Sequence, residues 1–478
     1  MNKKPVVQPV VLSPHRRQFL QWTAAGAGAW LLPACGGAGR VEQFLLVPGV
    51  EAFRVASPTT SYYVNSVSGN DLADGKTAQT PWKNLSKVNA LTLQPGNVIN
   101  LGCGSVWSEQ LSIRHSGTEQ APIVVQAYGS GEAPTIKRMT GRYEYTNGVL
   151  VTGNFVHILE LRVSDVHWSA ISLGTGTQYN VVAGNEIVNS GNGIEILGAH
   201  QRVLSNYIHD MTMVVDDGNA ETAWGANGLG FRGEDIEIAY NRFVRCRAQS
   251  KNFGGWDGGA FEYFGFEDAV TRWNQVTRNV RIHHNFLDYC DSFIEANGQI
   301  DGLLIAYNLY VNIPGSVFEF HMRTNEGIKN TYKNVRIENN TLIEPSNASF
   351  GFWIVENEVP PYPTGGNSFA IRNNLIVLVN GVIWGLWTLG SDLVHDHNLF
   401  YTLPGGNLGS GTNLWVKVAT EILTTVAPGF ANYAAKDYRL TAGSVAIGAG
   451  AVSSMTSDLF GRAVPAGLPA DIGAYQHA

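Results

Sequence analysis

The segment Val280-Arg281-Ile282-His283-His284-Asn285 shows a pattern that recurs along the middle of the chain. Apolar residues alternate with other residues, and an asparagine follows at the end of each run. The asparagines at this position are Asn185, Asn206, Asn241, Asn285, Asn308, Asn340, Asn374 and Asn398. Their spacing varies from 21 residues, between Asn185 and Asn206, to 44, between Asn241 and Asn285. Such a repeat indicates a solenoid, in which the shortest spacing is one coil and the longer spacings contain loops.

A bulky apolar residue follows two positions after each of these asparagines. These residues are Ile187, Ile208, Phe243, Leu287, Tyr310, Leu342, Ile376 and Phe400. Alternation on both sides of the asparagine predicts two strands joined by a turn. Stacked side-chain amides can donate and accept hydrogen bonds from coil to coil, and asparagine tolerates left-handed backbone angles. A propeller would need a nearly constant repeat of about 40–50 residues, which the irregular spacing argues against.

This repeat resembles the asparagine ladder of the pectate-lyase-like right-handed parallel β-helix superfamily. The segments around Pro81-Trp82 and Asp471-Ile472 resemble the entry and closing segments of that fold, and the resemblance covers about residues 61–478. It implies an all-β, single-stranded right-handed parallel β-helix with a short capping helix over Trp82–Leu91. The fold hosts lyases, hydrolases, epimerases and spike proteins, so it does not specify a reaction.

The amino terminus contains the parts of an export signal in the expected order. Arg16 and Arg17 stand before a weakly apolar stretch, which resembles a twin-arginine signal. The stretch ends in Leu32-Pro33-Ala34-Cys35, which resembles a bacterial lipobox. The resemblance implies a lipidated Cys35 that anchors the exported protein to the bacterial cell envelope, at the outer membrane, or else a periplasmic protein. An ordinary cleaved signal and a disordered basic tail are the alternatives.

These signals divide the chain into five parts. We expect a signal in residues 1–35, a tether in 36–60, the cap and first coils in 61–140, the β-helix core in 141–425 and a closing segment in 426–478. The net charge of −7 argues against a nucleic-acid partner, because phosphate contacts need basic patches. No apolar run reaches the roughly 18 residues that span a bilayer. We therefore expect a monomer that contacts the membrane through its lipid anchor only.

About ten residues beyond each ladder asparagine, a second short strand is expected. The resemblance implies that it belongs to the first sheet of the fold, whose outer groove carries catalysis in many members. Large apolar residues of this strand should point inward, so Glu262, Glu295 and Glu319 should point outward in one column on consecutive coils. Carboxylates so close together must raise a pKa, share a proton or bind a cation, for which Ca²⁺ is the candidate. A merely solvated row of glutamates is the alternative.

Loops beside this column supply further candidates. The candidate catalytic residues are Glu262, Glu295, Glu319, Asp257, Lys251 and Arg323. The candidate substrate-binding residues are Trp256, Arg232, Asn297, His321, Trp353 and Trp384. The tryptophans among them can serve as stacking platforms for pyranose rings.

Three functions are compatible with this pattern. A glycoside hydrolase would cleave a polysaccharide or oligosaccharide with two of the carboxyl groups. A polysaccharide lyase would hold Ca²⁺ against a uronate and use Lys251 or Arg323 as the base. A non-catalytic glycan-binding or structural surface protein would use only the aromatic groove. The glutamate column and the lack of a dense basic cluster favour the hydrolase over the lyase.

Cys246 and Cys290 each follow a ladder asparagine by five positions, so they occupy equivalent places in consecutive coils. Their Cα atoms should lie about 5 Å apart, within the disulfide range of roughly 4.4–6.8 Å. Other coils have apolar residues at this position, and we therefore predict two buried thiols rather than a disulfide.

Overall fold

A computed structural model describes residues 49–138, 146–216, 218, 224–251, 255–264, 276–314, 317–320, 331–344, 368–378, 393–403 and 415–477. Contacts divide the chain into residues 1–32 and 33–478, and every described residue lies in the second part. Arg16, Arg17 and Cys35 lie outside the described residues, so export and lipidation stay predictions. Within the described residues, no helix has the length and apolar character needed to cross a bilayer.

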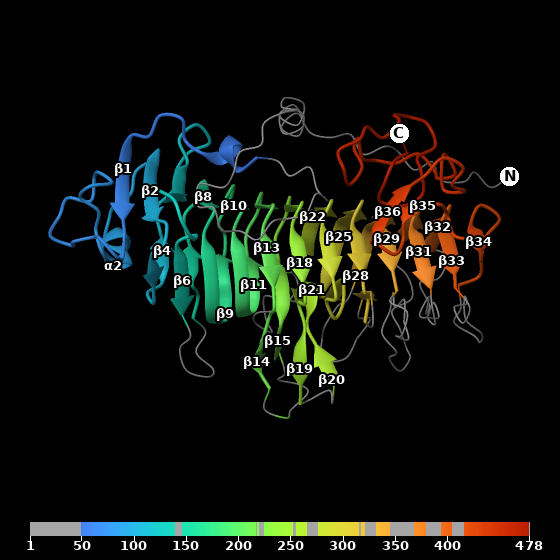
Figure 1. Ribbon diagram of the computed structural model, residues 1–478, viewed down its shortest axis with the longest axis horizontal. Coiled ribbons are helices and arrows are strands. Elements are labelled where there is room, and N and C mark those ends of the chain that lie inside the picture. Colours follow the sequence, from blue (N-terminus) through green and yellow to red (C-terminus); the bar gives the residue numbers. More distant parts are fainter. Residues whose placement is uncertain are drawn as a thin grey trace. The chain divides into compact units, whose positions relative to one another are not determined.

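Most of the described strands lie in parallel sheets, to which successive coils add their strands (Figure 1). The sheet that precedes the ladder asparagines, called sheet A here, has 12 strands. They are β1 (Thr60–Val64), β2 (Asn97–Gly102), β5 (Ile123–Tyr128), β8 (Val156–Leu159), β10 (Val181–Ala183), β12 (Arg202–Leu204), β17 (Glu237–Ala239), β22 (Val276–His283), β25 (Gln299–Ala306), β28 (Thr331–Glu338), β30 (Phe369–Arg372) and β32 (Leu393–Asp396).

Two further rows of parallel strands complete the coils, and the long strands β9 (Arg162–Leu173) and β11 (Glu186–Ile196) run through both rows. The row that follows the ladder asparagines, sheet B, also contains β3 (Val106–Trp107), β6 (Thr135–Arg138), β13 (Tyr207–His209), β18 (Arg242–Val244), β23 (Phe286–Asp288), β26 (Leu309–Val311), β29 (Thr341–Ile343), β31 (Leu375–Leu378), β33 (Leu399–Thr402) and β34 (Ile422–Thr424). The last row, sheet C, also contains β4 (Leu111–Ile113), β7 (Val149–Val151), β16 (Asn227–Phe231), β21 (Gly259–Phe264), β24 (Ile294–Asn297) and β27 (Phe318–Phe320). The predicted parallel β-helix is therefore confirmed.

The eight predicted ladder asparagines are buried and form one hydrogen-bonded column between sheets A and B. Nδ2 of each donates to Oδ1 of the next, at 2.9–3.1 Å. The last, Asn398, donates instead to the carboxylate of Glu421, at 2.8 Å. Buried polar groups that were left unpaired would cost free energy, and this column satisfies them from coil to coil.

The left-handed backbone conformation at this turn belongs to the residue before the asparagine. Ser205, Tyr240 and His284 have φ angles of 61°, 60° and 56°. We expected the ladder asparagine itself to benefit from tolerance of these angles, and this part of the interpretation was wrong. The asparagine is needed for its hydrogen bonds rather than for its backbone freedom.

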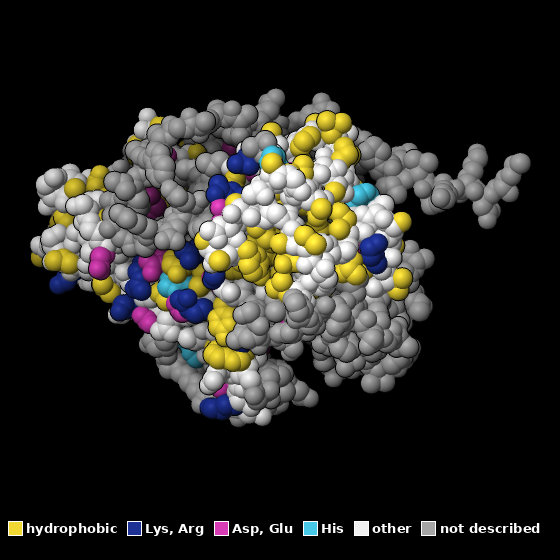
Figure 2. Space-filling model, turned by 45° about the vertical axis from the view of Figure 1, so that its right-hand side comes forward, with side chains coloured by type: hydrophobic (Ala, Val, Ile, Leu, Met, Phe, Trp, Pro, Cys, Tyr) yellow, Lys and Arg dark blue, Asp and Glu magenta, His cyan; other side chains and the backbone are white. Residues whose placement is uncertain are grey.

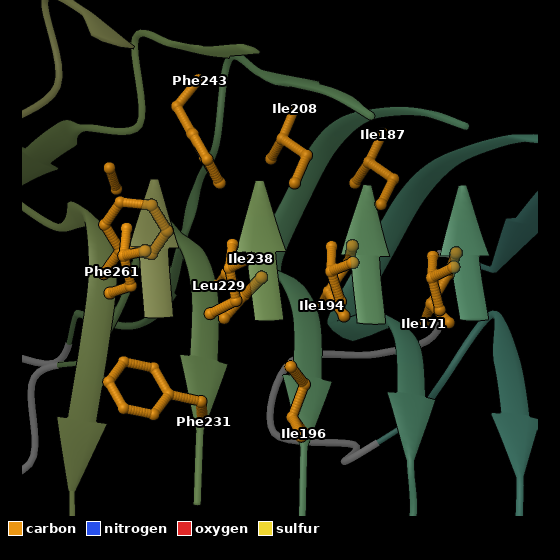
Figure 3. Close-up of a cluster of buried hydrophobic side chains, with 14 of the residues drawn as sticks. Ile171, Ile187, Ile194, Ile196, Ile208, Leu229, Phe231, Ile238, Phe243 and Phe261 are labelled. Carbon is orange, nitrogen blue, oxygen red and sulfur yellow. The ribbon is translucent and has the colours of Figure 1, made fainter. Parts of the chain in front are cut away.

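The interior of the coils is filled by columns of apolar side chains. The bulky residues two positions after the ladder asparagines are all fully buried, as their alternation predicted. Figure 3 shows Ile187, Ile208 and Phe243 side by side, one from each successive coil. Cys246 and Cys290 lie in the same core as buried free thiols, which confirms the prediction for this pair.

The N-terminal described residues differ from the prediction in two places. Residues 49–59, expected to be part of a tether, lie against sheet A. There, Val50 and Phe53 of the 3₁₀-helix Val50–Phe53 pack on its outer apolar residues, and the Phe53 carbonyl lies 2.7 Å from Nδ1 of His157. The helix predicted over Trp82–Leu91 is limited to α2 (Leu85–Asn89).

The C-terminal segment covers the outer face of sheet B. It contains the hairpin of β35 (Phe430–Asn432) and β36 (Asp437–Leu440), drawn in red beside β29 in Figure 1. Its buried residues Tyr438, Ile472 and Tyr475 pack against the outward apolar residues of β26, β29, β31 and β33. These outward residues are thereby removed from water, which stabilises the last coils.

Outward positions elsewhere carry charges of both signs that are paired between coils. Arg162 lies 3.2 Å from Glu186, and Lys137 lies 3.8 Å from Asp165. Figure 2 shows Lys and Arg side chains interspersed with Asp and Glu side chains on one face.

Candidate active site

Sheet C carries the predicted glutamate column. Glu262 of β21 pairs in register with Glu295 of β24, and Glu295 pairs with Glu319 of β27. Phe261 and Phe320, next to the outer two glutamates along the strands, are fully buried in the core. Neighbouring strands lie about 4.8 Å apart, so the three glutamates stand on consecutive rungs of one outer face. The predicted register is therefore confirmed.

Two hairpins project from the coils beside this column (Figure 1). The first consists of β14 (Met213–Val215) and β15 (Trp224–Gly225), and the second of β19 (Ala248–Ser250) and β20 (Gly255–Asp257). The backbone N–H of Lys251 donates to Oδ1 of Asp216 at 2.7 Å, and the Lys251 Nζ lies 3.8 Å from Oδ2 of Asp216. Lys251 thus joins the second hairpin to the end of the first.

Glu262 is buried, contrary to the prediction that it would be accessible. Only 8% of it is exposed, because Trp224 Nε1 donates to its Oε1 at 3.0 Å and Asn227 Nδ2 donates to its Oε2. The Trp224 ring in turn stacks on Trp168, with centroids 4.2 Å apart. Burial, followed by the charge of Glu295, raises the pKa of Glu262 well above the usual range. The side chain does point outward, but the hairpin residue Trp224 covers it.

Asp257 is the last residue of β20, and the charge of Glu295 in the column affects its pKa. Its Oδ1 accepts a hydrogen bond from the Gly258 N–H at 2.8 Å. Gly258 has a φ of +112°, and a Cβ there would lie 2.6 Å from the carbonyl oxygen of Ala226, so this turn requires glycine. Burial, followed by the charges of Glu295 and Asp291, raises the pKa of Asp257 to about 6.

The candidate basic and amide residues differ from one another in their exposure and partners. The Lys251 side chain is 72% exposed beside Asp216. A guanidinium nitrogen of Arg232 lies 4.0 Å from Glu195, which belongs to a neighbouring coil of sheet C. Asn297 follows Glu295 by two residues, as expected, but it is only 7% exposed and is thus not a surface residue.

Trp256 of β20 is 45% exposed, and its role as a stacking platform stays a prediction. Arg323, His321, Trp353 and Trp384 lie outside the described residues, so their predicted roles stay predictions. Within the part of the chain that the structure describes, no group of three or more His, Cys, Asp or Glu residues is arranged to hold a metal ion. The Ca²⁺ hypothesis therefore rests on the sequence alone.

Sequence reasoning missed Trp224 and Asn227, the two residues that bind the Glu262 carboxyl group. A signal for Trp224 was present. Trp224 precedes the first residue of β16 by three positions, just as Trp256 precedes the first residue of β21 by three. The two tryptophans thus stand at equivalent places of successive coils, and the recognition of one as a site residue should have included the other.

The parallel sheets and the asparagine ladder define a parallel β-helix protein. No family model matches the chain. Over 126 residues, which are 25% of this chain, it is 38% identical to a lacto-N-biosidase from Bifidobacterium longum subsp. longum. The matched part spans 8% of that protein's length, so the similarity concerns a small portion of a much longer enzyme.

Among solved structures, the chain is similar to pectate lyase Pel9A, with a TM-score of 0.51 and 15% identity over 88% of this chain and 97% of the lyase. It is also similar to a GH136 lacto-N-biosidase from Eubacterium ramulus, with a TM-score of 0.45 and 15% identity over 73% of this chain and 64% of that one. The likeness to Pel9A shows a shared fold. The named relatives and neighbours are carbohydrate-active enzymes.

Proposed function

We propose that this protein is a glycoside hydrolase whose active site lies on the outer face of sheet C. The observation that carries the proposal is the combination of Asp257, with a pKa of about 6, and the half-buried Glu295 at the centre of the glutamate column. Glycoside hydrolysis needs one protonated and one ionised carboxyl group beside the scissile bond. A carboxyl group whose pKa is raised towards neutrality can supply the protonated member of such a pair. The partial identity to a lacto-N-biosidase supports this class.

In this proposal, Asp257 is the general acid that protonates the glycosidic oxygen, and Glu295 is the nucleophile or the base. Glu262 remains protonated in its buried position, so that the site does not accumulate another negative charge beside Glu295. The neighbouring rung at Glu319 offers a further carboxyl group to the substrate. Trp256 stacks on a pyranose ring.

The substrate that fits best is a neutral glycan. Glu295 and Glu319, which stand on adjacent rungs, would repel the carboxylates of a polyuronate. A lyase would also require a base, and Lys251 is a poor one because its side chain is 72% exposed and paired with Asp216, without the burial that activates catalytic lysines. These two features favour hydrolysis over elimination.

The test is the product formed from a panel of neutral and uronic polysaccharides and a lacto-N-biosidase substrate, with and without a chelator. We expect new reducing ends without near-ultraviolet absorbance, in the presence of chelator as well. An unsaturated uronide whose formation stops with chelator would identify a Ca²⁺-dependent lyase instead. Binding without any product would identify a glycan-binding protein.

A further inference from the structure

Arg247 lies between strand β18 and the hairpin that carries Asp257, and it is one of the most buried charged residues near the site. Its side chain is only 6% exposed. Its guanidinium carbon lies 4.1 Å from the centre of the Trp256 ring and 4.4 Å from that of Tyr289. A guanidinium nitrogen lies 3.2 Å from the Asp291 carboxylate.

These contacts connect two parts of the site. Trp256 belongs to strand β20, directly before Asp257. Tyr289 and Asp291 belong to the turn between β23 and β24, and β24 carries Glu295. Arg247 therefore links the hairpin to the turn that leads into the central strand of the glutamate column.

The chemistry of the contacts requires an arginine. The planar guanidinium group can stack on aromatic rings through its face while its edge donates to a carboxylate. A lysine ammonium group is a point charge on a flexible chain, so it can pair with Asp291 but cannot stack in the same way. An ion pair alone would leave the hairpin free to rotate about the contact.

We propose that Arg247 is a positioning residue, which fixes the β19–β20 hairpin against the next coil and so holds Asp257 and Trp256 beside Glu295. This inference rests on the proposed function for its catalytic meaning, because Arg247 itself is not assigned a contact with substrate. Its structural part, the immobilisation of the hairpin, can be measured without any substrate.

The experiment compares wild type with Arg247→Met, Arg247→Lys and a matched control, Arg245→Met. Arg245 lies two residues earlier, but its side chain is 49% exposed and paired with Asp210, away from the hairpin. We expect faster amide hydrogen exchange in residues 248–250 and 255–257 of Arg247→Met, a smaller increase in Arg247→Lys, and none in Arg245→Met. Unchanged exchange in a folded Arg247→Met, or in Arg247→Lys if the methionine variant does not fold, would overturn the proposal.

The pH profile gives the second measurement. Burial is the largest cause of the raised pKa of Asp257. Release of the hairpin would expose Asp257, so this pKa should fall towards the ordinary carboxyl value of about 4. The alkaline limb of the activity profile should then move from about pH 6 to lower pH in Arg247→Met, whereas partial unfolding would only reduce the amplitude. A limb that does not move would overturn the role of Arg247 in placing Asp257. Absence of glycan cleavage by the wild type would instead overturn the proposed function, and the exchange experiment would still decide whether Arg247 holds the hairpin.

Discussion

Neighbouring residues of the glutamate column lie in different environments. Glu262 and Glu295 are paired in register on adjacent strands. Glu262 is buried and accepts hydrogen bonds from Trp224 and Asn227, whereas Glu295 is only partly buried. A buried carboxyl group prefers the neutral form, and a neighbouring negative charge strengthens that preference. The same residue type can therefore be held in the protonated form at one position while its neighbour on the next rung stays partly open to solvent.

Glu295→Ala should abolish glycan cleavage with little change in melting temperature. A carboxyl group that acts as base or nucleophile contributes on the order of 10²–10⁴ to the rate. The side chain points away from the core, because its neighbours Ile294 and Ala296 are buried, so its removal leaves no cavity among the core residues. Turnover and thermal unfolding are measured with Glu234→Ala as the control, because Glu234 is an exposed glutamate two coils away. Full turnover of Glu295→Ala on its identified substrate would contradict the assignment.

The pH dependence of activity tests Asp257. A general acid works only when protonated, so activity should decline as the pH rises through about 6, the pKa of Asp257 in the folded protein. Asp257→Asn should lose about 100-fold or more in rate and should remove this limb from the residual activity. If the limb persists in Asp257→Asn, another group supplies the proton.

At the scale of elements, the asparagine ladder couples the coils. Asn285 donates to the carbonyls of Ile238 and His283 and to Asn308, all at 3.0 Å, and accepts from Asn241. Because this one side chain forms hydrogen bonds with buried groups of several coils, its removal should destabilise more than one coil. The effect should also be larger than the loss of a surface hydrogen bond.

Asn285→Ala should lower the free energy of unfolding by at least the roughly 1–3 kcal/mol that one unsatisfied buried polar group costs. Asn432→Ala removes a hydrogen bond that the exposed Asn432 side chain accepts from the Ala435 N–H, and it serves as the control, with an expected loss of at most about 1 kcal/mol. Chemical denaturation of both variants measures the difference. Equal stabilities of the two variants would show that the ladder is not a major source of stability.

Glu421 adds a pH-dependent term to the stability of the last coils. Burial alone would raise its pKa, but hydrogen bonds from His395, Asn398 and Trp415 outweigh burial and lower it. A carboxylate with a lowered folded-state pKa stabilises the protein above its ordinary pKa of 4.5, and this stabilisation is lost as the pH falls through the folded-state value. Glu421→Gln should therefore be less stable than wild type near pH 7, and the deficit should shrink below about pH 4.5 in unfolding experiments. A deficit that is independent of pH would contradict this.

The sequence was sufficient for the elements and their register, because both depend on local alternation. The position two residues after each ladder asparagine had to face the core, and a shift by one residue would have buried Glu262, Glu295 and Glu319 among apolar side chains. The surroundings of Glu262 could not be read in the same way. They depend on a hairpin that folds back over sheet C, and the equivalent places of Trp224 and Trp256 in successive coils do not show which group Trp224 contacts.

At the scale of the molecule, both described terminal segments pack against the outside of the coils. Residues 49–59 lie on sheet A, and the C-terminal segment lies on sheet B. The packing of residues 49–59 was not visible in the sequence, because this short segment has no repeat and resembles a linker in composition. The described part of the chain thus buries apolar residues on outer faces as well as in the central core.

Export remains to be tested on the whole chain. Replacement of Arg16 and Arg17 by lysines should retain the protein in the cytoplasm, and Cys35→Ser should leave it without lipid. The reason is that a twin-arginine signal is read by its export receptor and a lipobox cysteine is the acylated residue, as the resemblance implies. Cell fractionation and the mass of the mature amino terminus are the measurements. Wild-type behaviour of both variants would contradict this reading of the amino terminus.

The asparagine ladder also has a polarity. Each Nδ2 points towards the next residue in the column, from Asn185 to Asn398, so the amide dipoles of the side chains are aligned. Aligned peptide dipoles give an α-helix a positive and a negative end, and an anion is stabilised at the positive end. The positive end of this column lies at Asn398, where the Glu421 carboxylate accepts the final hydrogen bond. Glu421 therefore closes the column in the way that an acidic residue stabilises the first turn of a helix, in a fold made almost entirely of strands.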